Sequence, residues 1–299
     1  MSETTARPKL TVAQRRKRKI LTAKLVRAGI QLFFFLAMPG AFAAGFNGVK
    51  TIFQTIGSGG VLEGSSFVLA LAGLCAFTVL FGRFFCGYAC AFGSMGDLVH
   101  WLSALFQKKI LKKKKVFAFS PAVLRWLQKI KYVNLVFIVV LCMLSLYSVL
   151  NGNSPWDVFS RTTSMQGIPE GYTVGIVLLV LVIAGFALQE RFFCQVLCPM
   201  GAVFALLPTF PFAFLQRKSE NCIKGCDACR KQCPVGIKLE KDGLRNGECI
   251  SCEKCTGVCP KGNISRTELR VLKNEYVSLA IRAILFFALG CWLGLCRFL

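Results

Sequence analysis

Five apolar runs, each close to the length needed to cross a bilayer, constrain this chain more than any other feature. They lie near residues 28–46, 67–85, 132–150, 172–188 and 277–295. A membrane-spanning helix needs about 20 apolar residues, and fewer where flanking charged side chains reach the interface. Hydrophobic residues make up 55% of the chain, too many for an ordinary soluble domain. The sequence therefore predicts an α-helical membrane protein, in which the last run, with Arg282 inside it, is a candidate fifth span.

An internal duplication divides the membrane core into two units. The pattern R-F-F-C-x3-C at 83–90 recurs at 191–198, and each copy follows two apolar runs joined by a short loop. Repeated membrane units of the same orientation commonly pack about a pseudo-twofold axis along the membrane normal. We therefore predict a four-span core of two repeated two-helix units. The paired cysteines of the two copies should converge at one additional redox or metal site, small packing residues being the alternative: Cys86, Cys90, Cys194 and Cys198.

Basic residues are distributed unevenly among the connecting segments. Residues 1–27 hold nine Lys and Arg, residues 82–131 hold ten and residues 191–275 hold fourteen, whereas 46–66 and 151–171 hold one each. Cytoplasmic loops of membrane proteins carry this positive excess. We expect the cysteine pairs and the basic N-terminus on the cytoplasmic side of the inner membrane. The same rule explains the 37 Lys and Arg against 14 Asp and Glu, and it argues against nucleic-acid binding.

The first apolar run has a second interpretation. A basic leader, an apolar segment and Ala41-Phe42-Ala43 are together typical of a cleaved signal peptide. The duplication favours a retained span, because cleavage would remove one of four matched helices.

Eight of the 16 cysteines lie within residues 222–259 at the spacings of iron–sulfur ligands. The second run, C-x2-C-x2-C-x3-C-P at 249–260, matches the bacterial ferredoxin pattern, in which the fourth cysteine ligates the other cluster. Paired C-x2-C motifs also bind zinc, but two four-cysteine runs that each end in Cys-Pro favour two 4Fe–4S clusters. The predicted ligand sets are therefore crossed: Cys222, Cys226, Cys229 and Cys259 for one cluster, and Cys249, Cys252, Cys255 and Cys233 for the other.

The first cysteine run departs from the ferredoxin spacing. Three residues instead of two separate Cys222 from Cys226, and Gly225 is one of them. We expect a local bulge to absorb the extra residue, because glycine adopts positive φ without strain.

Few other side chains are candidates for proton chemistry. The single histidine, His100, cannot supply a bis-histidine haem site. It lies just past the first cysteine pair, where an interfacial packing role is favoured over proton transfer, with Asp97 as a weaker candidate base. Asp157 and Glu170 are the candidate proton acceptors if a quinol site opens to the outer side.

These motifs, taken together, resemble those of a known family. Two copies of R-F-F-C-x3-C on a four-span core, followed by a two-cluster cysteine run, resemble the NapH-type membrane ferredoxins and the wider group of NosR-like and CcoG-like proteins. The resemblance covers residues 28 to about 266. It implies quinol oxidation, or related electron delivery between the quinone pool and a partner redox enzyme. Two features depart from the family: Ala91 stands where Pro199 stands in the second copy, and a C-terminal span is not expected.

The expected organisation has four parts. They are a basic cytoplasmic segment at 1–27, the membrane core at 28–215, a small α+β ferredoxin module with two clusters at 216–270, and a candidate C-terminal transmembrane helix at 271–299. Two rival functions stay open. One is a copper reductase or assembly factor that uses the membrane cysteine pairs, since soft thiolates suit Cu(I). The other is a redox-sensing regulator. If the chain is an enzyme, it is a quinol dehydrogenase component of an oxidoreductase system.

Overall fold

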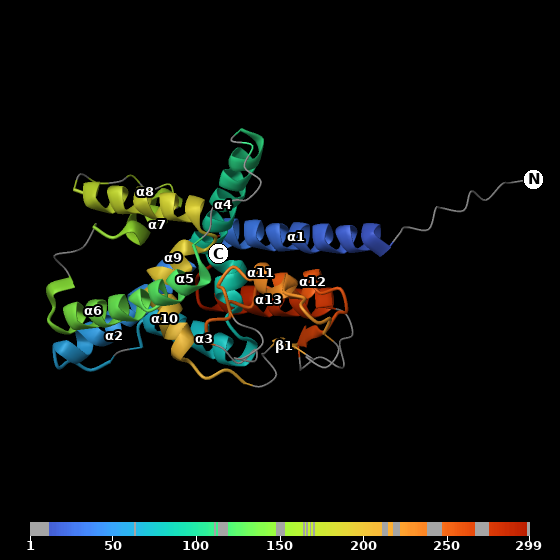
Figure 1. Ribbon diagram of the computed structural model, residues 1–299. Coiled ribbons are helices and arrows are strands. Elements are labelled where there is room, and N and C mark those ends of the chain that lie inside the picture. Colours follow the sequence, from blue (N-terminus) through green and yellow to red (C-terminus); the bar gives the residue numbers. More distant parts are fainter. Residues whose placement is uncertain are drawn as a thin grey trace, which may run out of the picture.

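The computed structural model describes residues 12–62, 64–110, 112, 119–147, 153–163, 165, 167, 169, 171–210, 215–217, 222–237, 247–266 and 275–297. Within these residues the chain is mostly helical, with one small sheet (Figure 1). The elements are α1 (Val12–Ala37), α2 (Ala41–Gly57), α3 (Ser66–Phe81), the short π-helical turn η1 (Phe85–Ala89), α4 (Ala91–Lys109), α5 (Pro121–Leu127), α6 (Ile130–Met143), α7 (Pro155–Thr163), α8 (Thr173–Leu188), α9 (Phe192–Val196), α10 (Pro199–Leu206), β1 (Leu215–Arg217), α11 (Ala228–Lys231), α12 (Lys254–Val258), β2 (Ile264–Arg266) and α13 (Glu275–Trp292).

Three helical segments are long and apolar enough to cross a membrane. They are Lys17–Ala37, Ala122–Met143 and Glu275–Trp292. The apolar helices α3 and α8 have 16 residues each. At 1.5 Å per residue each is about 24 Å long, which is shorter than the roughly 30 Å hydrocarbon core. The helix Glu275–Trp292 corresponds to the candidate fifth span of the sequence analysis.

The first predicted span, 28–46, is not one continuous helix. α1 ends at Ala37 and α2 begins at Ala41, with a turn at Pro39 and Gly40 between them. Proline lacks the N–H that would continue the hydrogen-bond ladder, so the helix breaks here. Phe34 in the last turn of α1 and Met38 just after the helix are fully buried, so the end of α1 is part of the core.

The third predicted span, 132–150, begins earlier than expected and ends earlier. The apolar segment runs from Ala122 to Met143, and residues 148–150 lie outside the described part of the chain. Ser120 caps its start by accepting a hydrogen bond from the Val123 N–H, and Pro121 occupies the first turn. The early start places Lys131 inside the apolar helix, where its side chain is fully buried and paired with Glu248.

Aromatic side chains fill the centre of the molecule, where α1, α3, η1 and α13 meet. The ring of Phe286 on α13 contacts Phe34, Phe77, Phe84 and Phe85 with centroid separations of 4.9 to 5.9 Å. Each such pair contributes about 0.5–1.5 kcal/mol beyond area burial. α13 is therefore an integral part of the core.

A two-stranded sheet closes the cysteine-rich segment. β1 pairs antiparallel with β2, with Leu215 opposite Arg266 and Arg217 opposite Ile264. Leu215 and Ile264 are both buried. The chain therefore enters and leaves the segment at the same place, and the cysteines at 222–259 lie on the connection between the two strands.

Helix α4 is an element that the sequence analysis treated as part of a cytoplasmic loop. It packs against α8 and stands at a steep angle to α1 in Figure 1. Leu98, Trp101, Leu102 and Phe106 are exposed along it, and its last turn is basic. An exposed apolar surface with a basic end is typical of a helix at a membrane interface.

The C-terminal cysteines are linked to each other. Cys291 and Cys296 form a disulfide across the end of α13. Here Arg297 also donates its backbone N–H to the Ala37 carbonyl, which ties the chain end to α1.

Candidate iron–sulfur and thiol sites

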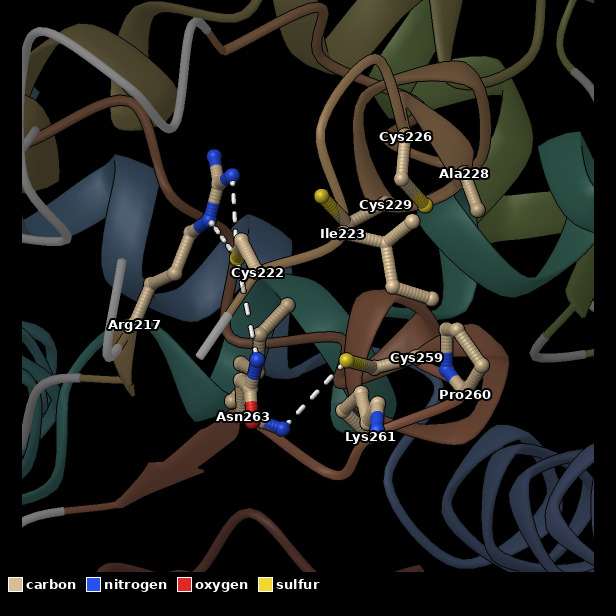
Figure 2. A pocket seen from close by; sticks show the side chains of 11 residues that line it. Arg217, Cys222, Ile223, Cys226, Ala228, Cys229, Cys259, Pro260, Lys261 and Asn263 are labelled. Carbon is tan, nitrogen blue, oxygen red and sulfur yellow. Dashed lines mark hydrogen bonds between the residues drawn. The ribbon is translucent and has the colours of Figure 1, made fainter. Parts of the chain in front are cut away.

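The first predicted ligand set surrounds one pocket (Figure 2). Three members come from the first cysteine run and Cys259 comes from the second, as crossed ligation requires. The pocket has an empty volume of about 360 Å³, part of it open to solvent. We call this set the open quartet: Cys222, Cys226, Cys229 and Cys259.

The irregular spacing of the first run is absorbed at its glycine. Gly225 has φ of 76°, in the left-handed region that costs glycine little. The turn lets Cys222 and Cys226 line the same pocket despite the extra residue between them.

Hydrogen-bond donors point at the sulfur atoms of the open quartet (Figure 2). Arg217 places Nε and Nη2 at 3.3 and 3.2 Å from Cys222 Sγ. Asn263 donates its backbone N–H to Cys259 Sγ at 3.3 Å and its side-chain amide to Cys222 Sγ at 3.7 Å. Four convergent thiols with cationic and N–H donors fit a 4Fe–4S cluster, whose thiolate ligands accept such bonds.

The second predicted ligand set is also brought together. Burial raises the pKa of the Cys233 thiol to about 12, and the nearby sulfur atoms of Cys252 and Cys249 act in the same direction. Burial likewise raises the pKa of Cys255, as do Cys252, Cys249 and Cys233. We call these four cysteines the membrane-facing quartet.

The membrane-facing quartet is docked directly onto η1. A Cβ atom at Gly87 would lie 2.4 Å from the Ile250 carbonyl oxygen and 3.5 Å from the Cys252 backbone, so only glycine fits there. Arg27 and Tyr88 both donate hydrogen bonds to the Cys252 carbonyl, at 3.3 and 3.4 Å. The ferredoxin-like loop and the turn that carries the first membrane cysteine pair are therefore in van der Waals contact.

The four membrane cysteines form a third thiol group. Their exposed fractions are 7% for Cys86 and Cys194 and 6% for Cys90 and Cys198. Burial raises the pKa of Cys90, Cys194 and Cys198, and the other thiols of the group raise each of them further. The structure thus brings both pairs to one place. Across the described residues, no group of three or more His, Cys, Asp or Glu is arranged to hold a single metal ion.

The arginine of each repeat lies against a glycine of the other repeat. A Cβ atom at Gly93 would lie 2.1 Å from Nη1 of Arg191, and one at Gly201 would lie 3.3 Å from Nη2 of Arg83. In each repeat the glycine that follows the cysteine pair makes room for the arginine of the other repeat. This reciprocity is what a pseudo-twofold arrangement of the cysteine-bearing turns requires.

The arginine of the second repeat binds a buried carboxylate. Arg191 donates from Nε and Nη2 to the two Asp97 oxygens at 2.8 and 2.7 Å, and it also bonds to the Cys86 carbonyl. Arg27 and Gln31 of α1 donate to Asp97 at 2.8 and 2.7 Å. Burial alone would raise the pKa of Asp97, but Arg191 and Arg27 outweigh it and hold that pKa well below its usual range. Asp97 is therefore a structural anion, contrary to its role as a candidate base.

The arginine of the first repeat binds the cysteine-rich segment instead. Arg83 donates to the Gly247 carbonyl at 2.8 Å, lies 3.7 Å from Glu248 and has Nη2 3.9 Å from Cys86 Sγ. Lys131 and Tyr132 of the α5–α6 segment also donate to Glu248. No sequence motif predicts this set of ion pairs; the only signal was the scarcity of acidic residues, 14 Asp and Glu against 37 Lys and Arg. Two further pairs hold the segment: Lys254 with Glu190, and Arg282 with Glu253.

His100 and Asp157, the other candidate proton acceptors in the described residues, contact groups outside the three thiol groups. His100 Nδ1 is 3.2 Å from the Phe186 carbonyl oxygen, and burial lowers the pKa of this imidazole. This contact between α4 and α8 agrees with a packing role. Asp157 is hydrogen-bonded to Ser154 at the start of α7, and Glu170 lies outside the described residues.

Comparison with protein families gives a match on each repeat. A family described as "4Fe-4S binding domain" matches residues 64–114 and 172–219. Each matched segment contains one R-F-F-C-x3-C copy, and neither reaches the eight cysteines at 222–259. No solved structure matches the chain.

Several curated proteins are similar over most of the chain. An uncharacterised protein of Methanocaldococcus jannaschii is 31% identical over 184 residues, which cover 62% of this chain and 64% of that protein. The putative electron transport protein YccM of Escherichia coli is 27% identical, covering 64% of this chain and 53% of YccM. The ferredoxin-type protein NapH of the same organism is 24% identical, covering 64% and 65%. The similarity thus spans less than two thirds of each of these relatives.

The matches also include the regulatory protein NosR of Stutzerimonas stutzeri and the methylamine utilization ferredoxin-type protein MauN of Methylobacillus flagellatus. The chain therefore belongs to the group of 4Fe–4S membrane proteins that includes NapH and NosR.

Proposed function

We propose that this chain is an inner-membrane electron carrier that holds two 4Fe–4S clusters and exchanges electrons between the quinone pool and a partner redox protein. One observation carries the proposal: Cys259 of the second run lines the same pocket as the three remaining members of the open quartet. Crossed pairing of this kind is the signature of two-cluster ferredoxins. When bound, each cluster supplies a site for one electron.

The relatives support the same function. NapH and MauN are named as ferredoxin-type proteins, and YccM is named as a putative electron transport protein. The family model assigns 4Fe–4S binding to the segments that carry the membrane cysteine pairs. This supports a further redox or metal site at Cys86, Cys90, Cys194 and Cys198, between the quinone zone and the ferredoxin clusters.

The arrangement of the three thiol groups suits electron transfer. The membrane-facing quartet lies against η1, which carries Cys86, and α12 of that quartet packs against α11 of the open quartet. The segments that carry the three groups are therefore in contact with one another. A carrier needs this proximity, whereas a structural zinc site does not.

The proposed topology follows the charge distribution. The four-span core and the C-terminal helix would place both quartets on the cytoplasmic side, where 14 basic residues lie between 191 and 275. A membrane-impermeant thiol reagent tests this topology. A cysteine introduced at Lys261, which is exposed, should react only when the reagent has access to the cytoplasmic face of the membrane.

The test of the function uses the full chain, purified anaerobically in detergent. Addition of a reduced short-chain quinol should bleach the visible absorption of the clusters, and the oxidised quinone should restore it. The Cys252→Ser variant should show about half of the change, because it retains one cluster. Absence of iron, or clusters that respond to no quinol or quinone while dithionite reduces them, would overturn the proposal.

A copper-handling function is the second candidate, and the four buried membrane thiols are the observation that favours it. It predicts about one tightly bound copper per chain that is lost in the Cys86→Ser, Cys194→Ser double variant. Metal analysis of the protein purified from copper-supplemented cells separates the two functions. Iron without copper supports the electron carrier.

A further inference from the structure

A cluster of polar side chains lies within the apolar core. It is formed by Lys50 of α2, Tyr147 after α6, and Ser154, Trp156 and Asp157 at the start of α7. Tyr147, Ser154 and Trp156 have exposed fractions of 3%, 6% and 9%. None of the thiol groups uses these residues. Polar and ionisable groups are costly in a membrane core and are a functional-site hypothesis wherever they occur.

Lys50 is a cation held by aromatic rings. Its Nζ lies 4.9 Å from the centroid of the Tyr147 ring and 5.3 Å from that of Phe46. Asp157 is near enough to favour the charged amine electrostatically, but no ion pair within 4.0 Å joins them in the described part of the chain. The ammonium N–H groups therefore have capacity to donate to an acceptor that enters the cluster.

The indole N–H of Trp156 is a second donor that is available to a ligand. It is buried and forms no hydrogen bond of standard geometry, but it is close enough to the Tyr147 hydroxyl to interact with it. A buried donor without a full hydrogen bond is unfavourable, and an incoming acceptor would remove that cost. The ring itself is anchored by Phe46 and Phe193, at centroid separations of 5.1 and 6.4 Å.

The surroundings select for a flat, apolar ligand. Rings of Phe42, Phe46, Phe92, Phe159 and Phe193 lie within one connected aromatic group with Trp156. Such rings stack on a planar conjugated ring, while the amine, hydroxyl and indole supply donors to its oxygen atoms. A quinone head group has this combination of a flat ring and two carbonyl oxygens. Asp157 supplies a carboxylate for the hydroxyl groups of the reduced form.

The position of the cluster matches the function proposed above. Phe193, which contacts the Trp156 ring, directly precedes Cys194 of the membrane thiol group. The cluster is therefore connected to the membrane thiol group through the ring of Phe193. Resting on that proposed function, we propose that Lys50, Tyr147, Trp156 and Asp157 form the binding site for the quinone head group.

Binding is tested directly on the full, iron-loaded chain in detergent, with a fluorescent quinolone N-oxide that mimics the reduced head group. Trp156→Phe keeps the ring and removes only the N–H, and Lys50→Met keeps most of the stem. Each should weaken binding by about tenfold or more, the equivalent of one lost hydrogen bond. Iron content and melting temperature should stay at parental values.

Two matched controls accompany these variants. Trp101→Phe alters an exposed tryptophan on α4, and Arg161→Met removes the other outer-loop cation, which lies over the Tyr172 ring. Both should bind the probe as the parent does. If the parent binds but Trp156→Phe and Lys50→Met bind equally well, the site is wrong and the proposed function stands. If the iron-loaded parent binds no probe and exchanges no electrons with quinol, the proposed function fails and the site fails with it.

Discussion

The two cysteine quartets occupy contrasting surroundings. Exposed residues surround the open quartet, among them Lys224, Arg230 and Lys261, whereas buried residues such as Val235 and Ile250 flank the membrane-facing quartet. The same eight-cysteine segment therefore offers one cluster site to solvent and presses the other against the membrane core. Potential and reactivity of iron–sulfur clusters depend on solvent and hydrogen bonding, so the two sites should differ measurably although their ligands are identical.

The contrast also teaches how the segment is held. Its membrane-facing side is attached through buried hydrogen bonds and ion pairs, including Arg83 with Gly247 and Lys131 with Glu248. On the open side, the ion pair of Lys231 with Asp227 is exposed, at 75% and 50%. Removing one partner of a buried ion pair lowers the free energy of unfolding by several kcal/mol, whereas removing an exposed pair changes it little.

Loss of a ligand should have the largest effect. Cys252→Ser should reduce the iron content from about eight to about four atoms per chain, because one 4Fe–4S cluster no longer has four cysteine ligands. Iron and acid-labile sulfide analysis of the purified variant measures this. Cys142→Ser, at a buried cysteine outside the three thiol groups, is the control and should retain all the iron. An unchanged iron content in Cys252→Ser would contradict the assignment.

Removal of the Asp97 carboxylate should have the second-largest effect. Asp97→Asn leaves Arg191 and Arg27 without their carboxylate, and we expect a loss of about 3–5 kcal/mol in the free energy of unfolding. Thermal unfolding in detergent, followed by circular dichroism, measures the change. The matched control is Asp227→Asn, whose ion pair on the open side is exposed and whose removal should leave the melting temperature unchanged. Equal effects of the two variants would refute the contrast.

Chelation should distinguish the two sites by rate. An iron chelator added to the oxidised protein should remove about half of the iron in a fast phase, from the open quartet, and the rest slowly. The EPR signal that remains after the fast phase should be that of the Cys226→Ser variant, which lacks the open cluster. A single phase of iron loss would show that the sites are equally accessible.

The smallest effect concerns the potential of the open site. Arg217→Gln removes the guanidinium that donates twice to Cys222 Sγ. We expect the potential of one cluster to fall by roughly 60 mV, a tenfold change in the one-electron equilibrium. A redox titration followed by EPR measures it. Lys261→Gln removes a charge from the same pocket without removing a hydrogen bond to Cys222 Sγ, and should shift the potential less.

Parts of this account were accessible from the sequence for identifiable reasons. Cysteine spacing predicts the crossed sets because a cubane constrains which residues can reach it, and the glycine at 225 marked the position of the bulge. The duplication predicted that the two cysteine pairs would meet. Both inferences depend on local spacing or internal symmetry, which a single sequence displays directly.

The rest depends on contacts between distant segments. Nothing in the sequence near Asp97 on α4 indicates that Arg27 and Gln31 of α1 and Arg191, just before α9, will surround it. The docking of Glu248 on Lys131 was hidden for the same reason. The helix break at Pro39 was missed because hydropathy continues across it, although the proline itself was a local signal.

The most direct test of the central claim compares the EPR spectra of three reduced variants, each with one ligand cysteine replaced by serine. If the quartets are crossed, Cys259→Ser loses the same cluster as Cys226→Ser, and its remaining spectrum matches that variant. It should differ from Cys255→Ser, although Cys255 and Cys259 belong to the same run. A spectrum of Cys259→Ser that matches Cys255→Ser would show that each run holds its own cluster, and would contradict the arrangement described here.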